Sequence, residues 1–304
     1  MNKGSRFIIL VSVFALAVVT VSCKCNREPD DMLNVNPEDV KSDEELISSI
    51  ESVKQIFYSL PSPLETAMIL KRSGASYNEE LLNSIESVSK YNTTKSMALN
   101  LGIYSTDLSY ASLFDQTQAT IKYMTASKKM AEGLGILNAI DNSVIEKLEE
   151  NINNRDVILE TISETFLNTN SILQEDDRVA VGSMILVGGW VEGLYIATSL
   201  VDDVNKVDNE MVDRIIDQKL SLGTVLKLLE QSISNADVKE LYDDMLELQK
   251  VYNDIKIEVK DVKVVNSGES NVSTIKSNNV TSISPKSFEN LKTKVKELRN
   301  KYTA

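Results

Sequence analysis

The chain has 304 residues and a formal net charge of −13, from 45 acidic and 32 basic side chains. It has no histidine, and its two cysteines stand at positions 23 and 25, so the rest of the chain lacks the commonest zinc and haem ligands. This inventory excludes zinc hydrolysis, haem ligation by histidine and cysteine–histidine or serine–histidine–aspartate catalysis, and the acidic surplus argues against nucleic acid as a partner.

The first 22 residues have the layout of a secretion signal. A short basic stretch precedes residues 7–21, which carry no charge but fall short of the roughly 20 apolar residues that a membrane-spanning helix needs. Residues 20–23, Thr-Val-Ser-Cys, resemble the lipobox of bacterial lipoproteins cut by signal peptidase II, although Thr20 stands where leucine is usual. The resemblance implies cleavage before Cys23, lipidation of its thiol, with palmitate among the acyl chains, and a place in the cell envelope.

Two alternatives remain open for this end of the chain, a signal cut elsewhere and an uncleaved N-terminal anchor. Four interpretations remain open for Cys25: a second acylation site, a free thiol, an intermolecular disulfide partner or a tolerated tail residue. Residues 23–41 are rich in acids, asparagine and proline and poor in apolar side chains, so we expect a flexible tether there. The folded body is then expected over residues 42–304.

Apolar residues recur at helical spacing through the first half of this body. The expected helices run from Ser42 to a break at Pro61, then from a capping box of Ser62, Pro63 and Glu65 to about Gly74, and then over residues 79–88 with Tyr77 or Asn78 as the start. A further segment from Thr94 to about Gly133 holds one helix or two, because Gly102 and residues 105–112 weaken its continuity.

The second half shows stricter periodicity. Apolar residues at steps of three and four predict one helix over residues 143–173, on the order of 45 Å long at the standard rise per residue. The same rule predicts a helix over residues 238–262. A last helix is expected through Tyr302, with Ser284 as its cap and Pro285 as its first residue.

Residues 266–284 are mostly serine, threonine and asparagine, which predicts a flexible loop. The β-branched residues nearby leave an alternative, a β-hairpin of residues 256–265 against residues 280–283. Together these patterns predict an all-α fold, a multi-helix antiparallel bundle of roughly eight to ten helices within one chain. An extended coiled coil between chains fits the short breaks less well.

Residues 179–201 form the most unusual stretch, since they carry a single charge, Glu192. By length the stretch can span a membrane, but it has no aromatic belt and no basic flank, so we expect a buried central helix. Gly182, Gly189 and Gly193 recur near four-residue spacing. One side of this helix is therefore nearly bare backbone, and neighbouring helices can approach it closely.

Three stretches, IFYSLPSPLETAMIL at residues 56–70, YSTDLSYASLFDQTQ at residues 104–118 and GGWVEGLYIA at residues 188–197, carry a second resemblance. They are similar to a family of all-helical lipoproteins of Bacteroidetes type. The resemblance implies a helical fold and an envelope location over most of the mature body. It implies no activity and assigns no catalytic residue.

Two acids stand on otherwise apolar helix faces, Asp107 and Glu192. Burial would raise the pKa of each carboxyl, which is typical either of a proton-transfer or ligand site or of a buried acid with an internal partner. If the two met in an open cleft, they would form the minimal pair for glycoside hydrolysis or a hard cation. With Tyr104 and Trp190 nearby in sequence, these acids make up the candidate ligand pocket.

Tyrosines crowd residues 58–123, where they are expected in the core with hydroxyls at its rim, or else as the lining of a pocket. No phosphate-binding or calcium-loop motif occurs, so no cofactor, metal site or catalytic residue is predicted. We therefore expect a membrane-anchored outer-membrane lipoprotein, facing the periplasm or the surface, with a structural or protein-interaction role and an envelope protein as partner. The alternatives are an envelope ligand-binding protein and, third, a carboxylate-dependent hydrolase.

Overall fold

The structure is a computed structural model of the chain, and it describes residues 75–136, 142–162, 164–165, 178–201, 204, 210–255, 257–266, 273–281 and 283–304. The expected signal, Cys23, the tether and the helices expected before Gly74 lie outside the described residues. By its contacts, the segment Glu45–Ala304 forms one unit, and every described residue belongs to it.

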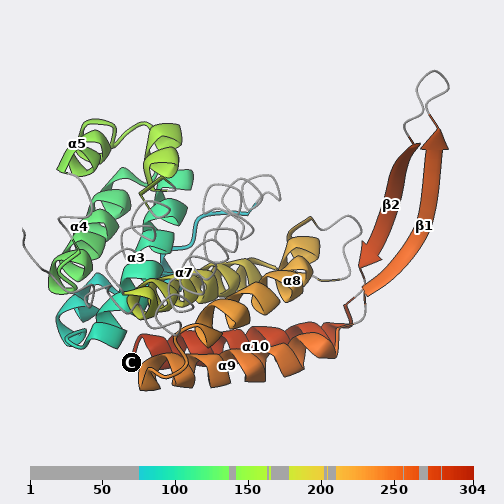
Figure 1. Cartoon of the computed structure of the whole chain (residues 1–304). Coiled ribbons are helices and arrows are strands. Elements are labelled where there is room, and N and C mark those ends of the chain that lie inside the picture. The colour runs from blue at the N-terminus through green and yellow to red at the C-terminus, as the bar shows by residue number, and fades with distance from the viewer. Residues whose placement is uncertain are drawn as a thin grey trace, which may run out of the picture. The chain divides into compact units, whose positions relative to one another are not determined.

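The described residues form an all-α fold with a β-hairpin before the last helix (Figure 1). In chain order the elements are the 3-10 helices η1 (Glu79–Leu81) and η2 (Ile85–Lys90), then α3 (Thr94–Leu113), α4 (Thr117–Gly133), α5 (Asn142–Glu150), α7 (Val179–Leu200), α8 (Glu210–Glu230), α9 (Ala236–Asn253), strands β1 (Ile257–Asn266) and β2 (Ser273–Thr281), and α10 (Pro285–Tyr302). The predicted all-α fold class is confirmed.

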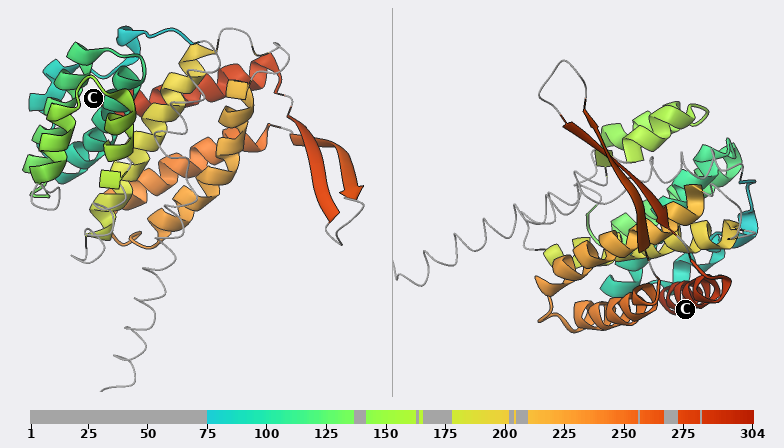
Figure 2. Two further views of the ribbon diagram at one scale, coloured as in Figure 1. Left: turned by 90° about the horizontal axis from the view of Figure 1, so that it is seen from above. Right: turned by 90° about the vertical axis from the view of Figure 1, so that its right-hand side faces the viewer.

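The helix α7 lies between α3 on one side and the helices α8, α9 and α10 on the other (Figure 2). Among the described residues it is the one helix long and apolar enough to cross a membrane by length and composition. Two-thirds of its most apolar window is nevertheless buried inside the protein, as in the core helix of a globular domain. The expectation of a buried central helix is confirmed.

Helices α3 and α7 touch through bare backbone. A Cβ added to Gly102 would lie 2.0 Å from the Ile185 carbonyl oxygen, and one added to Gly188 would lie 2.1 Å from that of Leu99. The Thr106 hydroxyl also donates to the Gly189 carbonyl, at 3.2 Å. The glycines that permit this approach are therefore Gly102, Gly188 and Gly189. Of these, the glycine spacing in the sequence predicts only Gly189 as part of a contact face.

Helices α9 and α10 run antiparallel, as expected for the bundle. The Lys301 ammonium near the end of α10 pairs with Glu240 and Asp244 near the start of α9, at 2.9 and 2.8 Å. By contrast, α3 and α7 run in the same direction across their contact, because Leu99 meets Gly188 and Thr106 meets Gly193 further along both helices.

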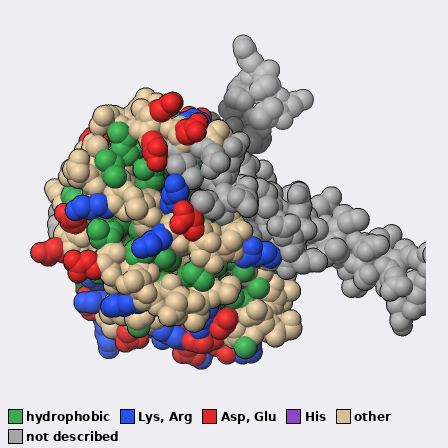
Figure 3. Space-filling model, turned by 90° about the vertical axis from the view of Figure 1, so that its left-hand side faces the viewer, with side chains coloured by type: hydrophobic (Ala, Val, Ile, Leu, Met, Phe, Trp, Pro, Cys, Tyr) green, Lys and Arg blue, Asp and Glu red, His purple; other side chains and the backbone are tan. Residues whose placement is uncertain are grey.

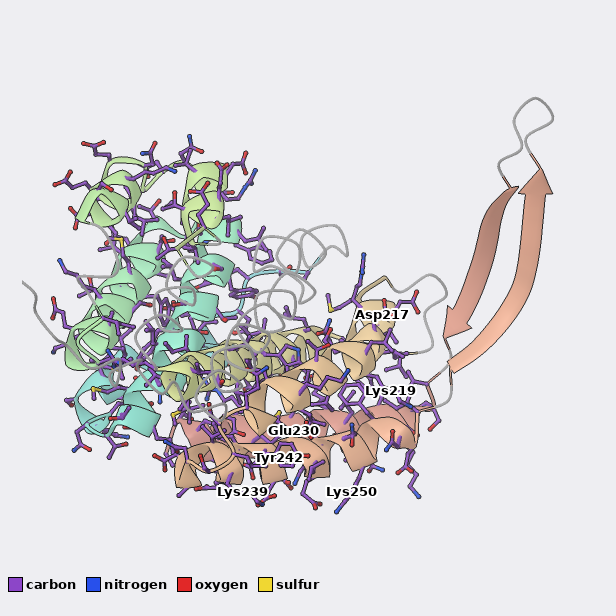
Figure 4. The ribbon with its side chains drawn as sticks, in the orientation of Figure 1. Asp217, Lys219, Glu230, Lys239, Tyr242 and Lys250 are labelled. Atoms are coloured by element: carbon purple, nitrogen blue, oxygen red, sulfur yellow. The ribbon has the colours of Figure 1, made fainter. Side chains whose placement is uncertain are left out.

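The solvent-facing sides of α8 and α9 carry polar pairs (Figure 4). The Tyr242 hydroxyl donates to a Glu230 carboxylate oxygen at 2.9 Å, and Lys239 pairs with Asp243 one turn along α9. Exposed pairs of this kind contribute about 0–1 kcal/mol each, so the apolar interior holds the helices together.

Helix ends follow the local sequence closely. Ser284 caps α10 by accepting the Ser287 amide hydrogen at 3.1 Å, with Pro285 in the first turn, as predicted. The Asn78 side chain likewise caps η1. The expected helix over residues 79–88 is wrong, however, because this stretch forms the two 3-10 helices η1 and η2 with an extended link between them.

The segment expected from Thr94 to Gly133 is two helices. The break is not at Gly102 but at residues 114–116, where Asp115 has a φ of 57°. Aspartate tolerates this left-handed conformation better than most side chains, so the chain can turn there. Gly102 stays helical because α7 requires close approach at that point.

The single long helix expected over residues 143–173 is wrong in its described part. Helix α5 ends at Glu150, a turn follows, and helical structure resumes at Arg155. The Asn151 side chain donates to the Lys147 carbonyl at 2.8 Å, and Asn154 accepts from the Val157 amide at 3.4 Å. Asparagine side chains thus cap the end of α5 and the start of the helical stretch at Arg155. The spacing of apolar residues carries no information about such caps.

The expected flexible loop over residues 266–284 is also wrong where it is described. Strand β2 lies within it and pairs antiparallel with β1, from Ile257 opposite Thr281 to Asn266 opposite Ser273, with a register shift between Lys260 and Val262. The helix expected over residues 238–262 ends at Asn253 for the same reason. Isoleucine and valine beyond that point favour a strand. The hairpin alternative was therefore correct in kind, but its second strand is Ser273–Thr281 and not residues 280–283.

Candidate functional site

The N-terminal segment, defined here as residues 75–92, lies against α3 and is fastened to it by polar side chains. The Tyr110 hydroxyl accepts the Asn78 amide hydrogen at 3.1 Å and donates to the Ser76 carbonyl at 3.3 Å. Further along, the Tyr104 hydroxyl donates to the Ser84 carbonyl at 2.9 Å. Side chains of α3 therefore satisfy backbone groups of a segment that is itself short of regular structure.

A buried ion pair joins α7 to α10 next to this segment. The Arg299 Nε donates to Glu192 Oε2 at 3.1 Å, and its Nη2 donates to Oε1 at 3.4 Å. The Glu192 side chain is 0% exposed and that of Arg299 is 13% exposed. This two-pronged geometry compensates a buried carboxylate far better than a single contact would.

Asp107 brings a second carboxyl group to the same place from α3. Its Oδ2 accepts the Asn83 amide hydrogen at 3.1 Å, and the residue is 0% exposed. Its Oδ1 is buried and has no hydrogen-bond donor among the described residues. Both side chains are fully buried, and the Glu192 charge raises the pKa of Asp107, so the two acids flagged in the sequence belong to one buried cluster.

The electrostatics of this cluster disfavour two separate negative charges. Burial raises the pKa of Asp107 well above its ordinary value, and the Glu192 charge raises it further. Burial also raises the pKa of Glu192, against the opposing effect of Arg299. Burial lowers the pKa of Arg299, but the Glu192 carboxylate outweighs it and leaves that pKa raised, so the guanidinium stays charged.

Arg299 also ties the cluster to its surroundings. Its Nη2 donates to the Leu81 carbonyl of the N-terminal segment at 3.3 Å. Its guanidinium carbon lies 4.9 Å from the ring centroid of Tyr195 on α7, within the range of a cation–π contact. One side chain of α10 thus contacts α7 and the N-terminal segment at once.

A neighbouring polar network fastens the C-terminus to the same segment. The Asn83 side chain donates to Asn100 Oδ1 at 3.0 Å and to the Tyr91 hydroxyl at 3.1 Å. Asn100 in turn donates to the Tyr302 carbonyl at 3.0 Å, and Tyr91 donates to the Thr303 carbonyl at 3.2 Å. The last turn of the chain therefore depends on the N-terminal segment for its buried hydrogen bonds.

Of the four candidate pocket residues, three are brought together and one is not. Tyr104 is fully buried on α3 near Asp107. Trp190 is turned toward α8, where its indole nitrogen donates to Gln218 Oε1 at 3.0 Å. Sequence reasoning missed Arg299 and Asn83. Arg299 follows Val295 by four and precedes Tyr302 by three, at the edge of the apolar stripe of α10, a weak signal for a basic residue that reaches inward.

The described tyrosines behave mainly as core residues. The rings form two groups. The Tyr77 ring stacks on that of Tyr110 at 5.4 Å between centroids, and the Tyr104 ring is tilted against those of Tyr91 and Tyr123, at 6.2 Å from each. Several of their hydroxyls bond the N-terminal segment rather than line an opening. Burial raises the pKa of Tyr77 to about 12. The core interpretation fits these residues better than a pocket.

The cluster can hold a proton and a buried ion pair, but it presents no reactive oxygen to solvent. Within the part of the chain that the structure describes, no group of three or more acidic, cysteine or histidine side chains could hold a metal ion. The guanidinium already stands where a cation would balance the two acids. The cluster therefore connects α3, α7, α10 and the N-terminal segment inside the protein.

Comparisons of the chain with protein-family models, with curated proteins and with solved structures found no match. The resemblance to helical lipoproteins of Bacteroidetes type therefore stays a prediction.

Proposed function

We propose that this protein is a membrane-anchored cell-envelope lipoprotein whose helical domain has a structural or protein-interaction role and no catalytic site. The observation that carries the proposal is the complete burial of Asp107 and Glu192. An acid that works on a substrate must reach it, whereas these two contact Arg299 and the N-terminal segment. These contacts hold parts of the domain together.

The lipobox-like residues 20–23 support the location. Several acyl chains on Cys23 would make attachment effectively stable, since one chain alone binds a membrane only marginally. We propose the outer membrane as the site of attachment, with the domain facing the periplasm or the surface. The partners that follow are the membrane itself and an envelope protein.

The surface fits a domain that works in water beside a membrane. On the face shown in Figure 3, acidic, basic and apolar side chains are interspersed, without the single-signed basic stripe that nucleic acid requires. The net charge of −13 points the same way.

The first alternative, a binding protein for an envelope ligand, needs a pocket at Asp107, Glu192, Tyr104 and Trp190. It is less well supported, because three of these residues are fully buried and Trp190 faces another helix. The third reading, a carboxylate-dependent hydrolase, needs the same two acids in an open cleft and shares this weakness.

The anchor is tested with Cys23→Ser in the full-length chain. Because the serine hydroxyl cannot replace the thiol as acyl acceptor, we expect radiolabelled palmitate to enter the wild type but not the variant. We also expect the variant to keep its signal and to leave the outer-membrane fraction. Cys25→Ser is the matched control and should label like the wild type. Equal labelling or equal partitioning of the Cys23 variant would refute the anchor.

The role of the domain is tested by capture from its own envelope. Tagged wild-type lipoprotein, cross-linked in intact cells, should retain a defined envelope protein in fixed proportion. Solvent extraction of the purified lipoprotein should release no small molecule in equimolar amount. A stoichiometric small ligand, lost on replacing Glu192 with glutamine, would instead establish the binding-protein reading.

A further inference from the structure

The buried cluster contains more acidic groups than basic ones. Two fully buried carboxyl groups, those of Asp107 and Glu192, lie near one guanidinium, that of Arg299, whose side chain is 13% exposed. With both acids ionised the cluster would carry a net negative charge, which a low-dielectric interior disfavours strongly. One proton added to the pair would make the cluster neutral.

Hydrogen bonding decides where that proton sits. Both Glu192 oxygens already accept from Arg299, and Asp107 Oδ2 accepts from the Asn83 amide. Asp107 Oδ1 is the buried oxygen of the pair that has no donor among the described residues, and Glu192 is the neighbouring carboxyl group. A hydroxyl at Oδ1 would donate to Glu192 and leave no buried oxygen of the pair unsatisfied.

We propose that Asp107 and Glu192 share one proton, donated from Asp107 Oδ1, and that this proton keeps the N-terminal segment closed on the helices. The segment contacts the cluster twice, through the Asn83 amide on Asp107 and through the Leu81 carbonyl on Arg299. Removing the proton places two negative charges together, and the pair can then regain water only if the segment covering it opens. The inference does not depend on the proposed lipid anchor.

Other titratable groups lie near the pair on each of the elements packed around it. They are Tyr77 and Glu79 on the N-terminal segment, Tyr104 and Tyr110 on α3, Tyr123 on α4, Tyr195 on α7 and Arg299 on α10. Burial raises the pKa values of Tyr77, Tyr104, Tyr110 and Tyr123, so these hydroxyls hold their protons more tightly than the hydroxyl of a solvent-exposed tyrosine. Glu79 lies on η1, and Arg299 keeps its positive charge.

The direction of the pH dependence follows from linkage. The closed form holds a proton that the open form releases once the pH exceeds the ordinary pKa of aspartate, because burial raises the pKa of Asp107 only when the segment is closed. Between the pKa values of the open and closed forms, opening becomes about tenfold more favourable for each pH unit. The shared proton stabilises the closed segment fully at low pH. This stabilisation is lost as the pH rises through the closed-form pKa.

Asp107→Asn tests the proposal in the full-length chain in detergent. An amide at this position donates permanently to Glu192 while its oxygen still accepts from Asn83, so it mimics the protonated acid. Hydrogen–deuterium exchange is measured for peptides covering residues 78–84 in the variant and in the wild type. The two proteins are compared at the same pH, so the pH dependence of the intrinsic exchange rate cancels. We expect wild-type protection to fall about tenfold per pH unit above the onset, and variant protection to stay constant. Asp254→Asn, the same change at an exposed position, should behave like the wild type.

A second readout keeps the test decisive if the variant folds poorly. Infrared spectra at neutral pH should show a protonated carboxyl band in the wild type that disappears in Asp107→Asn. In Glu192→Gln the band should disappear too, because ionised Asp107 then becomes the counter-ion of Arg299. The proposal is overturned if the wild type shows no such band, or if wild type and Asp107→Asn share one pH profile of exchange.

Discussion

Arg299→Met is expected to lower the free energy of unfolding by about 3–5 kcal/mol, because it leaves the Glu192 carboxylate buried without its counter-ion. Methionine keeps most of the aliphatic length of arginine, so the loss reports the charge rather than a cavity. Urea unfolding of the full-length chain, followed by circular dichroism, gives the value. The loss should include the contacts of Arg299 with Leu81 and Tyr195.

Two further variants isolate the buried charge as the cause. Arg155→Met removes a partly exposed arginine that pairs with Asp156 and Asp115 on the surface, and it should cost about 0–1 kcal/mol. The double variant Arg299→Met with Glu192→Leu should recover much of the single variant's loss, since no uncompensated charge remains. If Arg299→Met proves as mild as Arg155→Met, the buried pair does not stabilise the fold.

The parts of the fold predicted correctly from sequence are those decided by neighbours in the chain. Ser284 and Pro285 fix the start of α10 because a cap and a first-turn proline act over three residues. The bounds of α7 follow from an apolar run that ends at charged residues. Such signals need no knowledge of the rest of the molecule.

The errors arose where two local signals competed. Apolar spacing ran through Asn151 and Asn154, yet their side chains cap helix ends and break the helix there. The spacing also ran on from α9 to Val262, although the β-branched residues beyond Asn253 pair as a strand. Periodicity of three and four does not separate these outcomes, because it ignores capping and backbone propensity.

Only part of the candidate site could be predicted from the sequence. A lone acid on an apolar helix face marks a buried carboxyl group, and this picked out Asp107 and Glu192 correctly. Their meeting depends on how α3 packs on α7, and the nearby glycines Gly102 and Gly189 indicate a close helix approach without specifying which helix is the neighbour. Arg299 was missed because one basic residue at the edge of an amphipathic helix looks like an ordinary surface residue. Trp190 was misplaced because nearness in sequence to Glu192 was taken for nearness in space.

Gly102→Ala is expected to lower the free energy of unfolding by about 3 kcal/mol, through separation of α3 from α7. The added Cβ would lie 2.0 Å from the Ile185 carbonyl oxygen and 2.6 Å from the Gly189 nitrogen. Both atoms belong to the backbone of α7, so they cannot move aside as a flexible side chain would. The clash must outweigh the gain of about 1 kcal/mol that alanine brings to a helix interior.

Gly223→Ala provides the matched control, because the same substitution in α8 places its Cβ in open space. It should raise the free energy of unfolding by about 0.5–1 kcal/mol through helix propensity alone. Gly188→Ala, whose Cβ would lie 2.1 Å from the Leu99 carbonyl oxygen, should resemble Gly102→Ala. Opposite signs for Gly102 and Gly223 in urea unfolding would show that backbone contact, rather than glycine flexibility, matters at the α3–α7 crossing. Equal stabilisation at both positions would mean that the two helices do not touch there, and the packing that brings Asp107 to Glu192 would be wrong as well.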